Sequence, residues 1–383
     1  SLNFALISLR DVASKDDVLF IENVCSTLIE TLETTTEVSA LKKREYSIIE
    51  QSSQVILNDA LNQELIRADG MPTVLTNIPK EVEVSLGRIL STLGSLAHKH
   101  GQLTSLIDAV LSTQTCEGSS RKTIALWVSS WLVSGISEAS LKLETDYLNI
   151  DSDEILDKEA CYDVLEFGSD LAQTVVMQTE GVGLTASSER SLIVVLQSIE
   201  LVCNSLKEEF SSELMDYLYI VVENLGSSSP KVRHFAQSCA LTISHVLYND
   251  SLQQLILSNV DYLADSISSR LNSGMTERVS TVFMVICRIA GYETIESFKD
   301  IIETIFKLLD YYHGYSEMCL QFFQLFEVIA LEIQKKYLST NDEESRLTQE
   351  HKSNCGDAPW GMTSLNQVLA VMDKQRNRIL GGG

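Results

Sequence analysis

The segment SSSPKVRHFAQSCALTISHVLYND (227–250) decides the fold class of this chain. Ser229 is a typical helix N-cap, and Pro230 follows it at the position where proline best starts a helix. The apolar residues that follow recur with helical spacing and predict one buried face: Val232, Phe235, Ala236, Cys239, Ile243, Val246 and Leu247. A proline, then Val-Arg, then alanine three positions after the arginine is a common pattern for the first helix of a HEAT repeat. The segment therefore predicts a HEAT-like helix over about 230–247.

The next segment, SNVDYLADSISSRL (258–271), is expected to be the partner helix. Asn259 is a good N-cap, and Asp261 and Asp265 fall in the first turns, where the helix dipole favours negative charge. We therefore interpret both aspartates as ordinary helix-start residues and not as the acid and base of an active site. Tyr262 projects away from the apolar stripe, so it must pack on a neighbouring repeat or contact a partner, and both alternatives stay open. The stripe consists of Val260, Leu263, Ala264, Ile267 and Leu271.

The same helical period extends over most of the chain, for example in 81–101, 189–206 and 296–314, and no convincing alternating strand occurs. Only 4 prolines and 18 glycines occur, which is few for a protein of many strands and turns. The helices run in pairs of about 40 residues, the period of HEAT and armadillo arrays. Because one pair cannot bury its own apolar stripe, neighbouring pairs must stack. The sequence predicts an all-α, HEAT/armadillo-like α-solenoid of antiparallel helix pairs over residues 1–338.

Two segments interrupt this pattern. Residues 142–159 are rich in acidic residues and predict a solvated loop that leads into a helix, where the array could be subdivided. Residues 339–358 contain almost no large apolar side chain, so they cannot bury enough surface to offset the entropy of ordering. We expect a disordered acidic loop there, followed by a short C-terminal helix and tail over 359–383.

Charge and cysteine spacing exclude several function classes. The net charge is -24, so the chain repels nucleic-acid phosphates and anionic membrane surfaces, and we expect neither as a direct partner. None of the 8 cysteines forms a CxxC pair, which argues against zinc and redox motifs and favours a reducing, intracellular compartment. No phosphate-binding loop, nucleophile elbow or Cys/His signature is present. We therefore expect a protein without catalytic, cofactor-binding or metal-binding residues.

Aromatic side chains are the remaining candidates for function. The two tryptophans of RKTIALWVSSWLVSG (121–135) lie one turn apart on an apolar stripe, so core packing is preferred over a partner-binding role. The segment DYYHGYSE (310–317) crowds aromatic residues at a joint between helices, where they form either a plug between repeats or an exposed ridge. The candidate partner-contact residues are Tyr262, Tyr311, Tyr312, His313, Tyr315, Trp127 and Trp131.

Residues 228–273, SSPKVRHFAQSCALTISHVLYNDSLQQLILSNVDYLADSISSRLNS, resemble the Tel-Two-Interacting protein One family, the large subunit of the TTT cochaperone complex. VFMVICRIAG (282–291) and DYYHGYSE continue the resemblance, and RKTIALWVSSWLVSG is similar to the tryptophan-containing helix of the family. The similarity covers about 228–318, with a weaker similarity from about residue 80. Family members are considerably longer, so we expect a central-to-C-terminal part of such a protein.

This resemblance implies a HEAT-repeat scaffold without enzymatic activity. Its implied partners are the other two TTT subunits, phosphatidylinositol-three-kinase-related kinases and the ninety-kilodalton heat-shock chaperone machinery. It further implies a cytoplasmic and nuclear location and roles in telomere maintenance, the DNA damage response and TOR signalling. The alternative is another acidic α-solenoid adaptor, such as a nuclear transport receptor or a phosphatase-type scaffold. Those proteins repeat tryptophans on successive inner helices, whereas Trp127 and Trp131 share one helix, which disfavours the alternative.

Overall fold

The computed structural model describes residues 17–40, 74–75, 78–112, 119–143, 153–179, 184–272, 276–312 and 316–347. Every element of regular structure within these ranges is a helix, which confirms the all-α prediction. The chain divides into two compact units, Ser1–Glu332 and Ile333–Gly383, and the boundary falls inside the last described helix. Within the described ranges, no helix combines the length and the apolar character that crossing a lipid bilayer requires.

The helices are α2 (Asp17–Ala40), α4 (Lys80–Lys99), α5 (Leu103–Ser112), α6 (Ser119–Leu143), α7 (Asp153–Thr179), α8 (Ala186–Leu206), the 3-10 helix η2 (Lys207–Ser212), α9 (Leu214–Leu225), α10 (Pro230–Leu247), α11 (Leu252–Ser258), α12 (Val260–Asn272), α13 (Thr276–Ala290), α14 (Glu293–Ser297), α15 (Lys299–Tyr312) and α16 (Ser316–Leu347).

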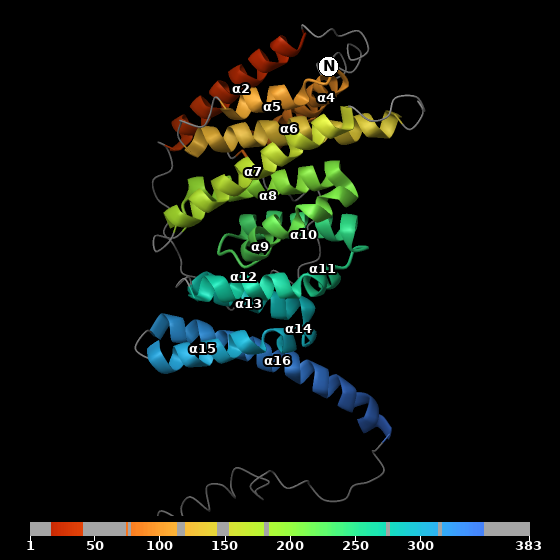
Figure 1. Ribbon diagram of the computed structural model, residues 1–383. Coiled ribbons are helices and arrows are strands. Elements are labelled where there is room, and N and C mark those ends of the chain that lie inside the picture. The colour runs from red at the N-terminus through yellow and green to blue at the C-terminus, as the bar shows by residue number, and fades with distance from the viewer. Residues whose placement is uncertain are drawn as a thin grey trace, which may run out of the picture. The chain divides into compact units, whose positions relative to one another are not determined.

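In the first unit these helices stack in successive layers (Figure 1). Helices α4, α6, α8 and α10 pack on one another in that order, α5 and α7 lie beside them, and α9 packs on α10. Helix α13 then packs on α9, α11 and α12. Each amphipathic helix thus buries its apolar face between neighbours, which is the arrangement of an α-solenoid.

Helix α10 forms as its sequence predicts. The Ser229 hydroxyl accepts a hydrogen bond from the Val232 amide at 3.4 Å, and Pro230 occupies the first turn. The Arg233 guanidinium donates to the Ser227 carbonyl at 2.7 Å and holds the preceding loop against the helix. Most of the predicted stripe is fully buried, and only its last two members are partly exposed. The buried members are Val232, Phe235, Ala236, Cys239 and Ile243.

Helix α12 forms, but its neighbours differ from the expected ones. The short helix α11 intervenes, so α12 packs mainly on α13, while α10 packs mainly on α8 and α9. Asn259 does not act as the expected side-chain oxygen cap. Its amide group donates backwards, to the Leu255 carbonyl at 2.7 Å and to the Tyr248 hydroxyl at 2.9 Å. Asp261 and Asp265 are exposed, in keeping with their interpretation as helix-start residues.

The predicted segment boundaries are met only in part. The segment 296–314, which the sequence predicts as one helix, is divided in two. It begins with the end of α14, the helix is broken at Phe298, and α15 starts at Lys299. Helix α16 continues to Leu347, into the segment 339–358 for which the sequence predicts a loop. Residues 348–383, with the expected C-terminal helix, lie outside the described residues, as does half of the expected loop 142–159, at 144–152. The rest of that segment belongs to the end of α6 and the start of α7. The division into predicted domains therefore stays a prediction.

Helices α4 and α6 cross at unusually short range because glycine occupies both sides of the contact. A Cβ atom on Gly94 of α4 would overlap the backbone carbonyl of Leu132 in α6. A Cβ atom on Gly135 of α6 would overlap the backbone of α4 at Ser91 and Ser95. The two backbones therefore touch without side chains between them.

Candidate partner-binding surface

The two predicted tryptophans lie on α6, and Trp131 lies at the contact of this helix with α4. Trp127 has an exposed fraction of 0% and meets Trp131 edge-to-face, with 6.4 Å between the ring centroids. Trp131 is partly exposed, and its ring lies over Gly87 of α4, where an added Cβ would come within 2.8 Å of the ring. The Trp131 ring thus packs α6 on α4, and Trp127 supports this ring from within α6. Trp127 presents no surface for a partner in this arrangement.

Tyr262 has an intermediate position on α12, neither buried in the core nor fully exposed. Its phenol group lies close enough to that of Tyr219 in α9 for the two to interact electrostatically. The ring of Tyr219 is itself covered by the Arg270 guanidinium, 3.9 Å from the ring centroid. Tyr262 therefore borders the α9–α12 contact, and a role in packing or in partner binding remains a prediction.

The aromatic segment DYYHGYSE begins in the last turn of α15. Tyr311 and Tyr312 form the last turn of α15, but their side chains are not among the described ones. His313 and Tyr315 lie outside the described residues. Their role as partner-contact residues stays a prediction.

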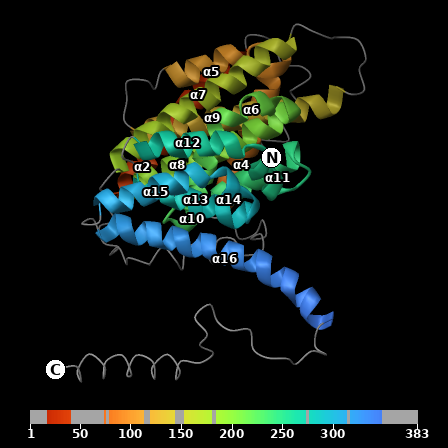
Figure 2. The same ribbon diagram turned by 60° about the horizontal axis from the view of Figure 1, so that its bottom comes forward.

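A different group of apolar side chains is exposed close by. The α15–α16 apolar face consists of the exposed Phe306 on α15 and, on α16, of the exposed Leu320, Phe323 and Leu331 and the half-buried Phe326. The exposed fractions of Phe306, Leu320 and Phe323 are 54%, 58% and 62%. Phe306 and Phe326 stack with 4.7 Å between their ring centroids, which joins the two helices into one surface. Figure 2 brings this end of the first unit forward.

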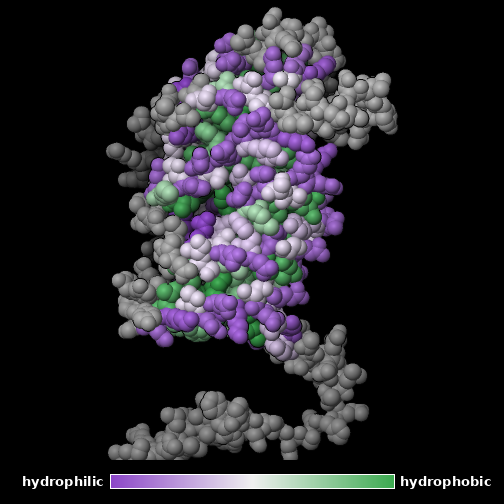
Figure 3. Space-filling view, in the orientation of Figure 1, coloured by the Kyte–Doolittle hydropathy of each residue, from purple (hydrophilic) through white to green (hydrophobic). Residues whose placement is uncertain are grey.

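The opposite side of α16 is the one that packs against the rest of the first unit. Phe322, Leu325 and Val328 alternate with the exposed side chains and are buried. Within the first unit, α16 is therefore apolar on two sides, although only one of them is covered. The view in Figure 3 shows a mostly hydrophilic surface interrupted by apolar patches, some of them toward the end that contains α12 to α15.

Helix α2, the first described helix, is a useful comparison. Its exposed side is mainly polar: the hydroxyls of Thr27, Thr31 and Thr34 donate to carbonyls one turn earlier in their own helix, at 2.7–2.9 Å. Phe20 is the exposed large apolar residue of this helix. The exposed side of α2 is thus suited to contact with water, whereas the exposed side of α16 is suited to contact with another apolar surface.

The α15–α16 apolar face is not among the surfaces predicted from the sequence, although the sequence contains a signal for it. Phe306 lies beside the predicted stripe of 296–314 and is too large and apolar for an exposed position on a solvated helix. The segment MCLQFFQLFEVIALEI (318–333) has more apolar residues than a single stripe can hold. An excess of this kind indicates a helix with two apolar contacts.

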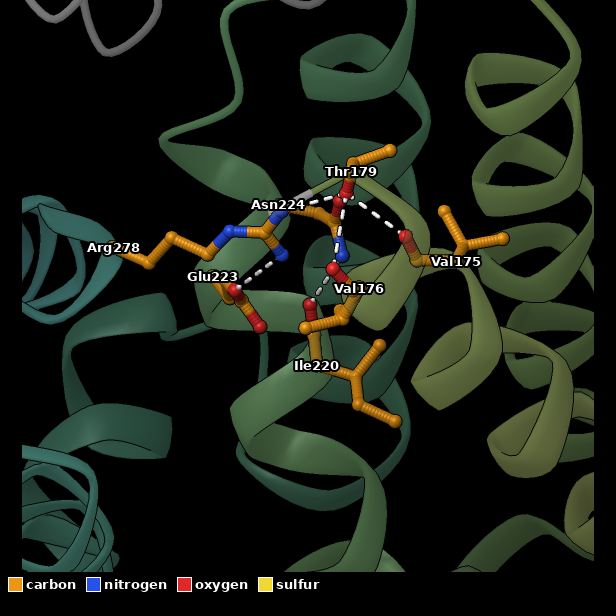
Figure 4. Close-up of polar contacts among 7 residues, drawn as sticks. All are labelled: Val175, Val176, Thr179, Ile220, Glu223, Asn224 and Arg278. Atoms are coloured by element: carbon orange, nitrogen blue, oxygen red, sulfur yellow. Dashed lines mark hydrogen bonds and ion pairs between the residues drawn. The ribbon is translucent and has the colours of Figure 1, made fainter. Parts of the chain in front are cut away.

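A polar cluster occupies the place where α7, α9 and α13 meet (Figure 4). Arg278 of α13 donates to the Thr179 hydroxyl of α7 at 2.7 Å and lies 3.5 Å from the Glu223 carboxylate of α9. The Thr179 hydroxyl donates its own hydrogen bond to the Val175 carbonyl at 2.8 Å, and the Asn224 side-chain amide donates to the Ile220 carbonyl at 2.8 Å. Burial raises the pKa of Glu223, and the nearby Arg278 and Arg270 oppose this shift. The cluster is thus a charged bridge between helices.

A second buried carboxylate links α8 to α10. Glu200 accepts hydrogen bonds from Ser238 at 3.0 Å and Thr242 at 3.2 Å, and burial raises its pKa despite these bonds. Neither carboxylate contributes to a metal site, since the described residues contain no group of three or more His, Cys, Asp or Glu side chains that could hold a metal ion. The chemistry of both groups is that of connectors between packed helices.

Comparison with known proteins identifies the family. A family model described as "Yeast TEL2-interacting protein 1, second TPR domain" matches residues 1–216, and one described as "TELO2-interacting protein 1" matches residues 218–306. The curated TEL2-interacting protein 1 of Saccharomyces cerevisiae is 43% identical over 379 residues, which are 98% of this chain and 36% of the yeast protein. The chain thus spans about a third of that relative's length. No solved structure matches the chain. On the extent of these matches, the chain belongs to the TELO2-interacting protein 1 family.

Proposed function

We propose that the chain is a non-catalytic scaffold of the TTT cochaperone complex and binds the other two TTT subunits. Its membership of the family supports this role, since the yeast relative is named for its interaction with TEL2. The observation that carries the proposal is the α15–α16 apolar face, because large apolar side chains exposed together are typical of surfaces that bind another protein. The stacked aromatic pair Phe306–Phe326 gives this face a rigid centre, which favours tight binding.

The finer role follows from the resemblance to the family. By holding the other TTT subunits, the scaffold presents phosphatidylinositol-three-kinase-related kinases to the ninety-kilodalton heat-shock chaperone machinery and supports their maturation. We propose a cytoplasmic and nuclear location for this role, with TOR signalling, the DNA damage response and telomere maintenance as the processes that depend on the kinases. Because the chain covers only part of the length of its relative, this role belongs to the whole protein to which such a chain contributes.

The test is capture of the other two TTT subunits by the co-expressed chain. The double variant Leu320→Ser with Phe323→Ser removes two exposed apolar side chains of the face. Burying such a side chain in an interface contributes about 1.5–3 kcal/mol. We therefore expect the Kd for the other subunits to rise by about tenfold or more, since 1.4 kcal/mol is tenfold in affinity.

The matched control is Phe20→Ser, which removes an equally exposed aromatic ring from α2 (64% exposed) and should leave capture unchanged. Circular dichroism should show that all variants keep their helical content. If the double variant captures the other subunits as well as the unchanged chain, the α15–α16 apolar face is not the binding surface. In cells, the same double variant in the full-length protein should lower the steady-state level of the kinases, and an unchanged level would contradict the role in their maturation.

A further inference from the structure

Arg278 connects helices that belong to different packing neighbourhoods. Helix α13, which carries Arg278, packs on α9, α11, α12 and α14, whereas α7 packs on α5, α6 and α8. The hydrogen bond from Arg278 to Thr179 nevertheless joins α13 to the last residue of α7, across 99 positions of sequence. In a stacked array each repeat contacts its neighbours, and the angle between repeats accumulates along the stack. A bond that reaches past the neighbouring layer can fix this angle.

The electrostatics of the junction favour a cation at this place. Both α7 and α9 end here, and the C-terminus of a helix carries a partial negative charge. The Glu223 carboxylate adds a full negative charge and is mostly buried. The position of Arg278 is unusual for its own helix, because it lies in the first turn of α13, where the dipole disfavours a cation. The guanidinium is therefore held by the ends of α7 and α9.

Close packing at the same junction holds α9 against α13 without any help from Arg278. Gly226 caps the end of α9, and a Cβ atom there would overlap the Thr281 side chain and come within 3.3 Å of Val285, both on α13. The end of α9 is thus pressed against α13. Helix α7 is joined to this pair through the Thr179 hydroxyl, which is 5% exposed and accepts from Arg278 while donating to its own helix.

We propose that Arg278 is a clamp that fixes the stacking angle between α7–α9 and α13. The guanidinium presents two nitrogens in a rigid plane, so one side chain holds Glu223 and Thr179 at the same time. Loss of the Thr179 contact releases α7 from α13 while α9 stays packed, so the array becomes more flexible at this junction without unfolding.

The test measures the distance between spin labels on exposed positions of the two sides, Thr174 on α7 and Glu296 on α14. The labels are introduced in a background in which the cysteines other than the five buried ones are replaced by serine. Double electron–electron resonance should give a narrow distribution of label-to-label distances for the unchanged junction. Thr179→Val, which removes the hydroxyl and keeps the shape, should broaden and shift it. Arg278→Lys should do the same, because an ammonium group lacks the fork that reaches both partners.

The matched control is Thr123→Val. The Thr123 hydroxyl is equally buried, donates to its own helix at 2.8 Å and meets the Ser191 hydroxyl at 2.7 Å, but it joins α6 to α8, which already pack directly. This variant should leave the distance distribution unchanged. The proposal is overturned if Thr179→Val and Arg278→Lys both give the narrow distribution of the control. The proposal about Arg278 is independent of the proposed role of the α15–α16 apolar face. The double variant Leu320→Ser with Phe323→Ser should weaken capture of the other TTT subunits and leave the distance between the two spin labels unchanged.

Discussion

Replacing Gly94 by alanine is a direct test of the α4–α6 contact. The added Cβ would overlap the carbonyl group of Leu132. Because the obstructing atoms belong to the backbone of α6, no rotamer change can make room for the methyl group. The two helices must move apart, and this also loosens the packing of Trp131 over Gly87.

Two opposing effects determine the size of the change. Alanine is a better helix former than glycine by about 1 kcal/mol in a helix interior. Forcing an extra carbon into a well-packed contact costs about 1–3 kcal/mol, and the upper end applies where the backbone is the obstacle. We therefore expect Gly94→Ala to lower the free energy of unfolding by about 1–2 kcal/mol in total.

Gly168→Ala is the matched control for this variant. Gly168 also lies inside a helix, α7, but its added Cβ would come no closer than 3.3 Å to its nearest neighbour, the hydroxyl of Ser198. A side chain of this kind can adjust, so we expect Gly168→Ala to be neutral or more stable by up to about 1 kcal/mol. Urea denaturation followed by circular dichroism gives both values under one protocol. A Gly94→Ala protein as stable as Gly168→Ala would refute the close backbone contact.

Two further predictions concern titratable groups. The raised pKa of Glu200 means that the folded state binds the proton more tightly than the unfolded state, so stability falls as the pH rises from the ordinary value of 4.5 through the raised pKa. Glu200→Gln keeps an oxygen that accepts from Ser238 and Thr242 but has no proton to lose. Its urea midpoints, measured between pH 4.5 and neutral pH, should therefore fall less steeply with rising pH than those of the unchanged chain. Parallel curves would contradict the burial of the carboxylate. Burial also raises the pKa of Cys203 and Cys287 to about 12, so both should resist alkylation at neutral pH. Among the described cysteines, the partly exposed Cys319 should react first in iodoacetamide labelling followed by mass spectrometry, and modification of the buried ones at the same rate would be the contrary result.

The sequence predicts α10 well because its determinants are local. Ser229 and Pro230 define the start, and the spacing of Val232, Phe235 and Cys239 defines the buried side. Neither depends on what lies elsewhere in the chain. The same reasoning fails at Asn259, where the preceding helix α11 and the Tyr248 hydroxyl compete for the side chain that would otherwise cap α12.

The candidate sites depend on distant contacts and were therefore harder to predict. Arg278 contacts Glu223 and Thr179, which lie 55 and 99 positions earlier in the sequence. The periodicity within one helix cannot predict contacts between helices so far apart. Its one local sign is an arginine in a first helical turn. Periodicity shows that α16 is apolar, but it cannot show which of its two apolar sides remains uncovered. Exposure of Phe306 and Phe323 follows from the absence of a covering helix among the described residues.

The difference between the outer sides of α2 and α16 also bears on self-assembly. If the exposed sides of α2 and α16 were both apolar, copies of the first unit could add head to tail through them, and contacts of that kind lead to open filaments because no symmetry closes them. The Thr27, Thr31 and Thr34 side of α2 instead offers hydroxyl groups together with one exposed aromatic ring, Phe20, to a surface that contains Phe323. The two surfaces are therefore poorly matched, and a head-to-tail contact between α2 and α16 is disfavoured.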